Sequence, residues 1–162
     1  MPKNTMETQI RQAKTSDIER IQELNAELSK MEAEEYDPTI DPEWTLTEEA
    51  ANWYRERINQ GNGYAVIAQQ DEQVIGYAIG VAGSAEVFRT TDTLAELETM
   101  YLQPEHRGQG IGTKLMENFK DWTEEKDADR LRVEASAQNK GAIRFYRENG
   151  FEDYALTLEE DF

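Results

Sequence analysis

The chain has 162 residues, a length typical of one domain, and its 34 acidic and 17 basic side chains give a formal net charge of −17. A field of that sign repels phosphate backbones and anionic lipid, so it excludes nucleic-acid or membrane binding through bulk charge and leaves cationic partners or adaptation to high salt as explanations. The absence of Cys excludes disulfides, thiolate metal sites and a Cys-linked intermediate, and a single His is too few for a His-rich zinc site.

The first part of the chain has the pattern of two helices. Apolar residues recur at helical spacing from Ile18 to Leu28, and Ser16 and Glu19 just before them have the spacing of a capping box. Prolines interrupt the stretch that follows. We therefore expect, in order, a strand at 8–11, a helix over 16–30, a loop over 32–43 and a second helix over 47–60.

The rest of the chain alternates between strand-like and helix-like segments. Pro104 ends one strand, and the apolar stripe begun by Ile111 marks the helix after it. The expected elements are a hairpin of 64–68 and 74–79, strands at 94–102, 131–135 and 154–158, and helices over 110–126 and 140–148. This order predicts a single domain, residues 1–162, of α/β class whose sheet has antiparallel and parallel parts.

A glycine-rich loop after the central strand predicts an anion site. Gly108, Gly110 and Gly112 stand at a helix start, where N–H groups without partners converge and the helix dipole is positive. Glycine has no Cβ to shield those amides, so a phosphate or pyrophosphate can come close. The order Thr113-Lys114 does not fit a P-loop, and Thr113 stands where a dinucleotide fingerprint needs glycine. The alternative is a tight turn that binds nothing.

A second segment, near the C-terminus, predicts a helix face that meets a ligand. Asn139, Ala142, Ile143 and Tyr146 share one face at helical spacing. The small Ala142 leaves room for a ligand, and Asn139 and Tyr146 offer hydrogen bonds. Phe145 points elsewhere, and we expect it in the core. Packing in the core is the alternative for Tyr146.

Together these segments resemble the GNAT-type superfamily of acetyl-CoA-dependent N-acetyltransferases. The run from Arg107 to Gly112 is similar to its Arg/Gln-x-x-Gly-x-Gly/Ala pyrophosphate signature. The run from Asn139 to Phe151 resembles its second segment, and the resemblance covers about residues 94–152. It implies a GNAT-like acyl-CoA N-acyltransferase fold, with a central mixed sheet of six to seven strands and about four helices.

The resemblance implies that acetyl-CoA lies in a wedge where the strand 97–102 diverges from its parallel neighbour at 131–136. Pantetheine would pair with backbone groups near Met100 and Leu102, and the pyrophosphate would rest on the amides of the glycine loop. The residues implied to bind the cofactor are Met100, Tyr101, Leu102, Arg107, Gly108, Gln109, Gly110, Ile111, Gly112, Thr113, Asn139 and Ala142.

The resemblance also implies two catalytic residues. Glu98 is the implied general base, directly or through water, and Glu96 is the reserve because it projects to the same face at period two. Tyr146 would protonate the leaving CoA thiolate, while a backbone N–H near Met100 would polarise the carbonyl oxygen. Because the chain has no Cys, transfer would be direct within a ternary complex.

Residues 1–60 carry a charge of −7 and contain the helices expected to wall the acceptor site. Their aromatic residues Trp44, Trp53 and Tyr54 are interpreted as core, and the acidic residues from Glu32 to Asp37 as a solvated run. If the acidic charge serves recognition, the acceptor is a small polycation.

We therefore expect an N-acetyltransferase that moves the acetyl group of acetyl-CoA to a primary amine. The alternatives are a non-catalytic acyl-CoA-binding or sensing module and an acyltransferase for a longer acyl-CoA. The expected partners are a small-molecule or protein amine, with no nucleic acid, membrane or metal, and a homodimer could cover the sheet edge beyond 154–158. The sequence shows no targeting segment and no membrane-length apolar run, so we expect a cytoplasmic protein.

Overall fold

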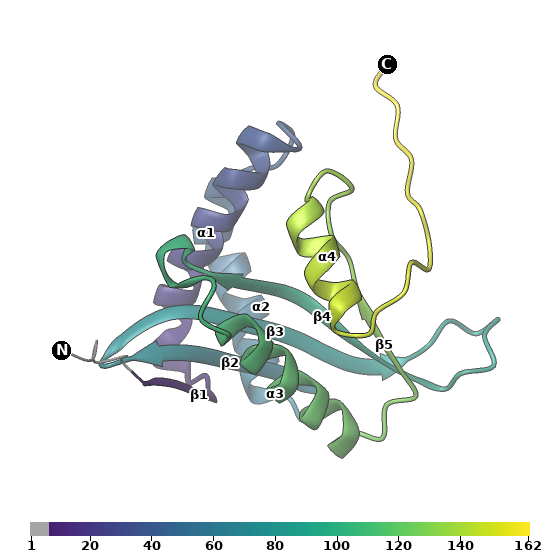
Figure 1. Cartoon of the computed structure of the whole chain (residues 1–162), viewed down its shortest axis with the longest axis horizontal. Coiled ribbons are helices and arrows are strands. Elements are labelled where there is room, and N and C mark those ends of the chain that lie inside the picture. Colours follow the sequence, from purple (N-terminus) through teal and green to yellow (C-terminus); the bar gives the residue numbers. More distant parts are fainter. Residues whose placement is uncertain (1–6) are drawn as a thin grey trace.

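A mixed sheet carries two α-helices on each of its faces. The computed structural model describes residues 7–162, whose five strands lie side by side in chain order. β1 to β4 are antiparallel neighbours, and β5 runs parallel to β4. The strands are β1 (Thr8–Gln12), β2 (Gly63–Gln70), β3 (Gln73–Ser84), β4 (Thr93–Leu102) and β5 (Arg130–Val133). The helices are α1 (Ile18–Glu35), α2 (Glu48–Asn59), α3 (Ile111–Glu125) and α4 (Lys140–Glu148) (Figure 1).

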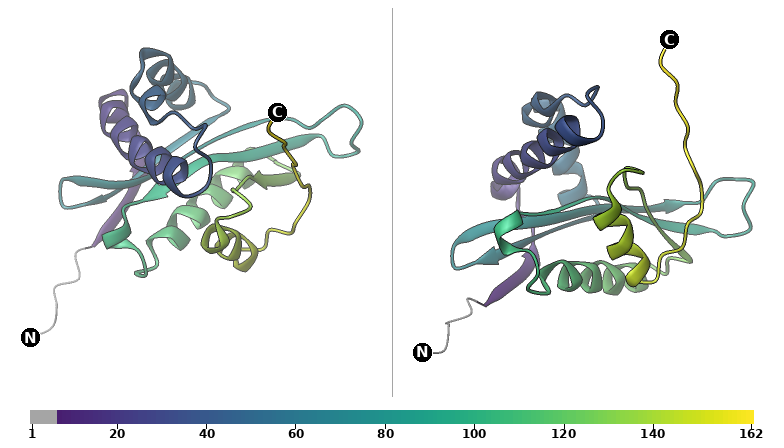
Figure 2. Two further views of the ribbon diagram at one scale, coloured as in Figure 1. Left: turned by 90° about the horizontal axis from the view of Figure 1, so that it is seen from above. Right: turned by 45° about the horizontal axis from the view of Figure 1, so that its top comes forward.

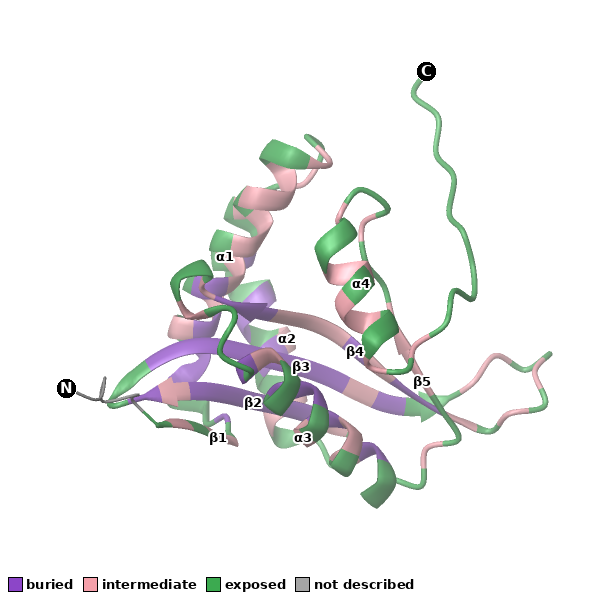
Figure 3. Ribbon diagram, viewed as in Figure 1, coloured by how far each residue is buried: buried purple, intermediate pink, exposed green. Residues whose placement is uncertain are grey.

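The sheet separates two apolar clusters. Helices α1 and α2 cover one face, and α3 and α4 cover the other (Figures 1 and 2). Successive side chains of a strand point to opposite faces. Tyr77 and Ile79 of β3 therefore pack in the cluster of α1 and α2, whereas Ala78 between them packs in the cluster of α3. The long central strands are buried along most of their length (Figure 3).

The first helix differs from the prediction at both ends. A short 3₁₀ turn, Thr15–Asp17, precedes it, and Asp17 takes the place expected for the Ser16 capping box. The Asp17 carboxylate accepts from the Lys14 N–H at 2.7 Å and from two guanidinium nitrogens of Arg11 at 2.8 and 3.0 Å. α1 then continues to Glu35 through part of the predicted loop, because Pro38 is the first residue that breaks it.

The last predicted strand is wrong. Residues 154–158 form no strand, and the sheet of residues 7–162 has five strands instead of the expected six to seven. The pattern of that segment is strand-like, but no other strand of the described chain pairs with it, and an unpaired segment is not a strand. The α/β class, the mixed sheet and the four helices of the prediction are confirmed.

Two searches of residues 7–162 give negative findings. None of their helices is both long and apolar enough to cross a membrane. No group of three or more His, Cys, Asp or Glu side chains within the same residues has an arrangement that could hold a metal ion.

Candidate active site

A wedge opens in the sheet halfway along β4. The parallel pairing with β5 ends at Leu97, so residues 98–102 have no partner strand on that side within the described chain. At the same point the register of β4 against β3 skips Glu98, which is the extra residue of a β-bulge between Leu97 and Thr99. The implied divergence of the two strands is confirmed, and it leaves a strand edge where a ligand with its own amides can pair.

The bulge turns two successive residues toward α1 and α2. Thr99 Oγ1 lies 2.9 Å from the hydroxyl of Tyr77, and Glu98 forms a bidentate ion pair with Arg57 of α2. In that pair Nε lies 2.6 Å from Oε1 and a terminal nitrogen lies 3.0 Å from Oε2. The side chains are only 16% and 19% exposed, and the Glu98 carboxylate raises the pKa of Arg57. Sequence reasoning missed Arg57, because a contact across 41 residues leaves no local signal.

Glu96 has different surroundings from Glu98. Its pKa is raised, first by burial and then by the negative charges of Glu98 and Glu134. Glu96 lines a cavity of about 290 Å³ together with Glu86 and Arg132, which form an ion pair. A carboxylate whose pKa is raised holds a proton more readily, which is a property of a general base. The two candidate bases therefore differ in their surroundings: Glu98 is paired with Arg57, whereas Glu96 lies near the carboxylates of Glu98 and Glu134.

The glycine loop presents a row of free backbone donors at the start of α3. Gly108 and Gly110 have φ of +81°, and an added Cβ at either would meet nothing within 4 Å. Their conformation therefore favours glycine, while the space beside them is open. The N–H groups of residues 108–113 have no acceptor in the described part of the chain. A row of free donors in open space is the arrangement that a pyrophosphate site needs, and the anion site itself stays a prediction.

Arg107 ties the glycine loop to the end of β4. Its Nε donates to the carbonyl oxygen of Leu102 at 2.8 Å, and its guanidinium carbon lies 5.5 Å from the centre of the Tyr101 ring. The Leu102 carbonyl, expected to pair with pantetheine, is therefore already an acceptor within the chain. Tyr101, Leu102 and Ile111 are buried, so only their backbone groups are available to a ligand, whereas Met100 is half-buried.

The start of α4 differs from the prediction at one residue. Asn139 lies just before the helix as its N-cap, and its Oδ1 accepts from the N–H of Ala142 at 3.1 Å. That oxygen is consequently occupied by the cap. Phe145 packs against the α3 cluster as expected, and a Cβ on Gly112 would lie 3.6 Å from its ring. Gly112 thus permits close packing of α3 on α4.

Tyr146 is held by aromatic neighbours and keeps a free hydroxyl. Its ring packs edge-on against Phe145 and Phe151, with centroids 5.6 and 6.0 Å away. Burial raises the pKa of Tyr146 to about 12, and the charge of Glu32 on α1 adds to the rise. No hydrogen-bond partner of the hydroxyl is found among residues 7–162. Tyr146 therefore stays protonated at neutral pH and can donate a hydrogen bond to a ligand.

The early aromatic and acidic residues divide between core and surface. Tyr54 is fully buried and Trp53 packs against its cluster, as expected, but Trp44 is 45% exposed and is not core. Glu32 was expected to be solvated. It is half-buried instead, and burial raises its pKa. Glu34 of the same run is exposed.

Comparison with known proteins gives one family. Residues 10–151 match the acetyltransferase (GNAT) family. The uncharacterized N-acetyltransferase YjgM of Escherichia coli is 30% identical over 125 residues, which cover 75% of this chain and 72% of that protein. An uncharacterized N-acetyltransferase of Methanocaldococcus jannaschii is 33% identical over 60 residues, 37% of this chain, and there the matched part spans only 26% of the relative.

A solved structure shares the fold. The aminoglycoside N-acetyltransferase AAC(6')-Iy, in complex with CoA, superposes with a TM-score of 0.74 at 17% sequence identity, covering 100% of this chain and 99% of that one. At that identity the likeness concerns the arrangement of the backbone. That structure holds CoA, and the likeness shows that this chain has the same fold.

Proposed function

This chain belongs to the acetyltransferase (GNAT) family, and from that premise we propose that it transfers the acetyl group of acetyl-CoA directly to a primary amine. The observation that supports this most is the row of free N–H groups at residues 108–113, beside the unpaired edge of β4. A pyrophosphate fits such a row, because the donors converge where the helix dipole is positive.

We assign the cofactor contacts to these two features. The backbone of Met100 to Leu102 borders the wedge, and the pantetheine amides would pair there, with the Leu102 carbonyl excluded because Arg107 already uses it. The loop from Arg107 to Ile111 and the first turn of α3, with Gly112 and the Thr113 hydroxyl, would hold the pyrophosphate. Asn139 and Ala142, at the start of α4, would border the cofactor on its other side.

In the proposed reaction the amine nitrogen attacks the thioester carbonyl carbon, and the C–S bond breaks as the C–N bond forms. The protonated amine must first lose a proton, and Glu98 is the proposed base. After the attack the nitrogen loses a second proton, which water carries to the leaving thiolate, so that the products are the N-acetylated amine and CoA. Because Arg57 binds both oxygens of Glu98, we propose that the first proton reaches Glu98 through a water molecule. Glu96, whose pKa is raised, remains the reserve base.

Tyr146 is proposed to assist the leaving thiolate by a hydrogen bond. Its pKa of about 12 lies above the value of about 8.5 for an ordinary thiol, so complete proton transfer from Tyr146 is uphill. A hydrogen bond to a charged acceptor needs no such transfer and stabilises the charge as it develops. The free hydroxyl supports this role.

We propose a small polycationic amine as the acceptor. Glu96 and Glu86 line the cavity of about 290 Å³ on the β4–β5 side, and Glu32 lies near enough to Tyr146 to raise its pKa. One carboxylate oxygen of Glu86 accepts no hydrogen bond within the described chain, although a guanidinium nitrogen of Arg89 lies 3.6 Å from it.

The test is a panel of amines with acetyl-CoA, followed by CoA release. Polyamines and aminosugars are expected to release CoA faster than neutral monoamines of similar length. Thermal melting should rise with saturating acetyl-CoA, because only the folded chain binds it. Unchanged melting would refute the proposal. Higher melting without CoA release from any amine would instead favour the acyl-CoA-sensing alternative.

A further inference from the structure

A buried hydrogen-bond network reaches the bulge of β4 from the side of α1 and α2. The hydroxyl of Tyr77 in β3 lies 2.9 Å from Thr99 Oγ1 and donates to Asn25 Oδ1 of α1 at 3.0 Å. Asn25 Nδ2 in turn donates to the hydroxyl of Tyr54 in α2. Tyr54 and Tyr77 are fully buried, so these contacts cross the core between the two helices and the sheet. The four residues are called the Tyr77 network below.

The donors and acceptors of the Tyr77 network follow from their chemistry. A carbonyl oxygen such as Asn25 Oδ1 only accepts, so the single proton of Tyr77 points to it, and Thr99 donates its own proton to Tyr77. Burial raises the pKa of Tyr54 to about 12 and that of Tyr77 well above its ordinary value, so both hydroxyls stay protonated near neutral pH. A buried network whose members are satisfied holds them in one arrangement, and a missing partner leaves a buried polar group unpaired.

The bulge is held by α2 from a second direction. Arg57 of this helix binds both carboxylate oxygens of Glu98, the residue before Thr99. Tyr54 and Arg57 are three residues apart on α2, so they share a helix face. The same face of α2 is therefore connected to both residues of the bulge, by an ion pair to one and by the Tyr77 network to the other.

The network also explains where the bulge lies. Residues two apart in a regular strand point to the same face, but Leu97 is buried in the α3 cluster and Thr99 meets Tyr77 on the opposite face. One extra residue between them, Glu98, satisfies both demands. Without the hydrogen bond from Thr99, residues 98–102 lose a restraint along the edge of β4 that borders the wedge.

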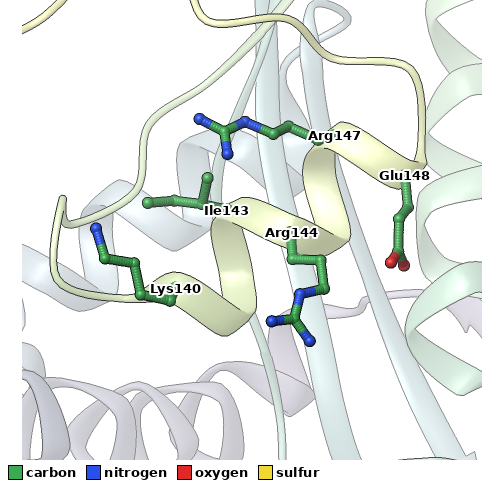
Figure 4. A pocket seen from close by; sticks show the side chains of 5 residues that line it. All are labelled: Lys140, Ile143, Arg144, Arg147 and Glu148. Atoms are coloured by element: carbon green, nitrogen blue, oxygen red, sulfur yellow. The ribbon is translucent and has the colours of Figure 1, made fainter.

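The helix α4, on the other face of the sheet, is held differently. Its Tyr146 is fixed by ring packing, and its charged side chains line a hollow of about 580 Å³ together with Ile143 (Figure 4). The other four lining residues are all exposed: Lys140, Arg144, Arg147 and Glu148. Exposed charges do little to fix a position, because water screens them. The buried polar restraint on the bulge therefore comes from the side of α1 and α2.

We propose that Tyr77 is a positioning residue for acetyl transfer: through Thr99 it fixes the bulge of β4, which carries the proposed base and borders the thioester. This inference rests on the proposed function, because it gives Tyr77 a part in that same reaction. Tyr77 is fully buried, so it acts through its neighbours and touches neither acetyl-CoA nor the amine. Loss of its hydroxyl should lower kcat and leave cofactor binding at the glycine loop intact.

The first test compares two matched tyrosine variants of the full chain. Tyr77→Phe should lower kcat by about 10- to 100-fold, because a misplacement of about 1 Å can cost that much, and should leave the KM and the calorimetric Kd for acetyl-CoA unchanged. Tyr64→Phe is the control. Tyr64 is 4% exposed, and its hydroxyl donates to Asn118 Oδ1 at 2.7 Å on the other face of the sheet. This control should lower the melting temperature and leave kcat unchanged.

The second test asks whether the hydrogen bond itself carries the effect. Thr99→Val keeps the shape of the side chain and removes the donor, so it should lower kcat as Tyr77→Phe does. Thr99→Ser keeps the hydroxyl and should retain most of the activity. Because both residues act through one hydrogen bond, the double variant Tyr77→Phe with Thr99→Val should lose about as much kcat as either single variant. Losses that add would show two independent structural effects and would overturn the inference.

Amide hydrogen exchange reports on the bulge without any turnover. Tyr77→Phe should speed exchange in residues 97–102, and Tyr64→Phe should not. An unchanged kcat in Tyr77→Phe, or an equal loss of kcat in Tyr64→Phe, would overturn the positioning role and leave the proposed function standing. A wild type that releases no CoA with any amine would instead refute the proposed function, and the positioning role with it.

Discussion

Replacement of Tyr146 by Phe isolates the hydroxyl group proposed to assist the leaving thiolate. The ring packs against Phe145 and Phe151, and the hydroxyl has no partner in the described chain, so the variant keeps the packing and removes no internal hydrogen bond. Tyr146 is half-buried, and its hydroxyl is not among the buried polar atoms that lack a partner in the described chain. Melting of the variant without ligand should therefore be unchanged.

The kinetic effect follows from one charge-assisted hydrogen bond. Such bonds contribute about 1.5–3 kcal/mol, which corresponds to a fall in kcat of roughly 10–150-fold. The KM for acetyl-CoA should change little, because the bond forms mainly as negative charge grows on sulfur. Since the pKa of Tyr146 is about 12, no loss of activity between pH 8 and 10 should depend on this residue.

The assay is CoA release under saturating acetyl-CoA and amine, measured over that pH range for wild type and Tyr146→Phe. Full turnover in the variant would return Tyr146 to a packing role. A basic limb near pH 9 that is present in the wild type and absent in the variant would refute the reasoning from burial.

Four further predictions concern the loop, the carboxylates and the charge. Gly110→Asp should abolish acetyl-CoA binding by calorimetry, because it places a carboxylate among the free amides, whereas Gly110→Ala should cost only about 1–2 kcal/mol of stability from its φ of +81°. Glu98→Gln should lower kcat/KM and remove its acidic limb, and Glu96→Gln should lower it much less; equal small losses would mean that both acids only attract substrate. Because the raised pKa of Glu96 means that its charge opposes folding, Glu96→Gln should raise the melting temperature at pH 7 and lose that advantage below about pH 4, where the unfolded carboxyl is also protonated. The KM of a polyamine should rise with salt, since exposed charges are screened over about 8 Å at physiological ionic strength; activity that increases toward molar salt would favour salt adaptation.

The sequence was most informative where local chemistry decides the structure. Glycines at a helix start predicted the free amides of residues 108–113, and the helix predicted over 47–60 is α2, which Thr47 caps. Strand periodicity predicted the β2–β3 hairpin. These features depend on residues close together in the chain, so they can be predicted from the sequence alone.

Features that depend on distant partners could not be predicted. Arg57 and Glu98 meet only after α2 packs on the sheet, and Asp17 replaces Ser16 as the local acceptor because Arg11 of β1 reaches it. The bulge at Glu98 depends on the register of β4 against β3. Residues 154–158 have the residue pattern of a strand but no partner strand in the described chain. The presence of a partner strand cannot be read from the segment's own residues.

The sheet also makes the chain modular for evolution and engineering. One apolar cluster contains residues of α1 and α2 and none of α3 or α4, and the other has the reverse composition. Distant substitutions with no shared contacts usually add without coupling. In a library randomised in the α1–α2 layer, most folded members should therefore still bind CoA, and their preference among acceptor amines should vary. In a library randomised in the α3–α4 layer, CoA binding should be the first property to be lost.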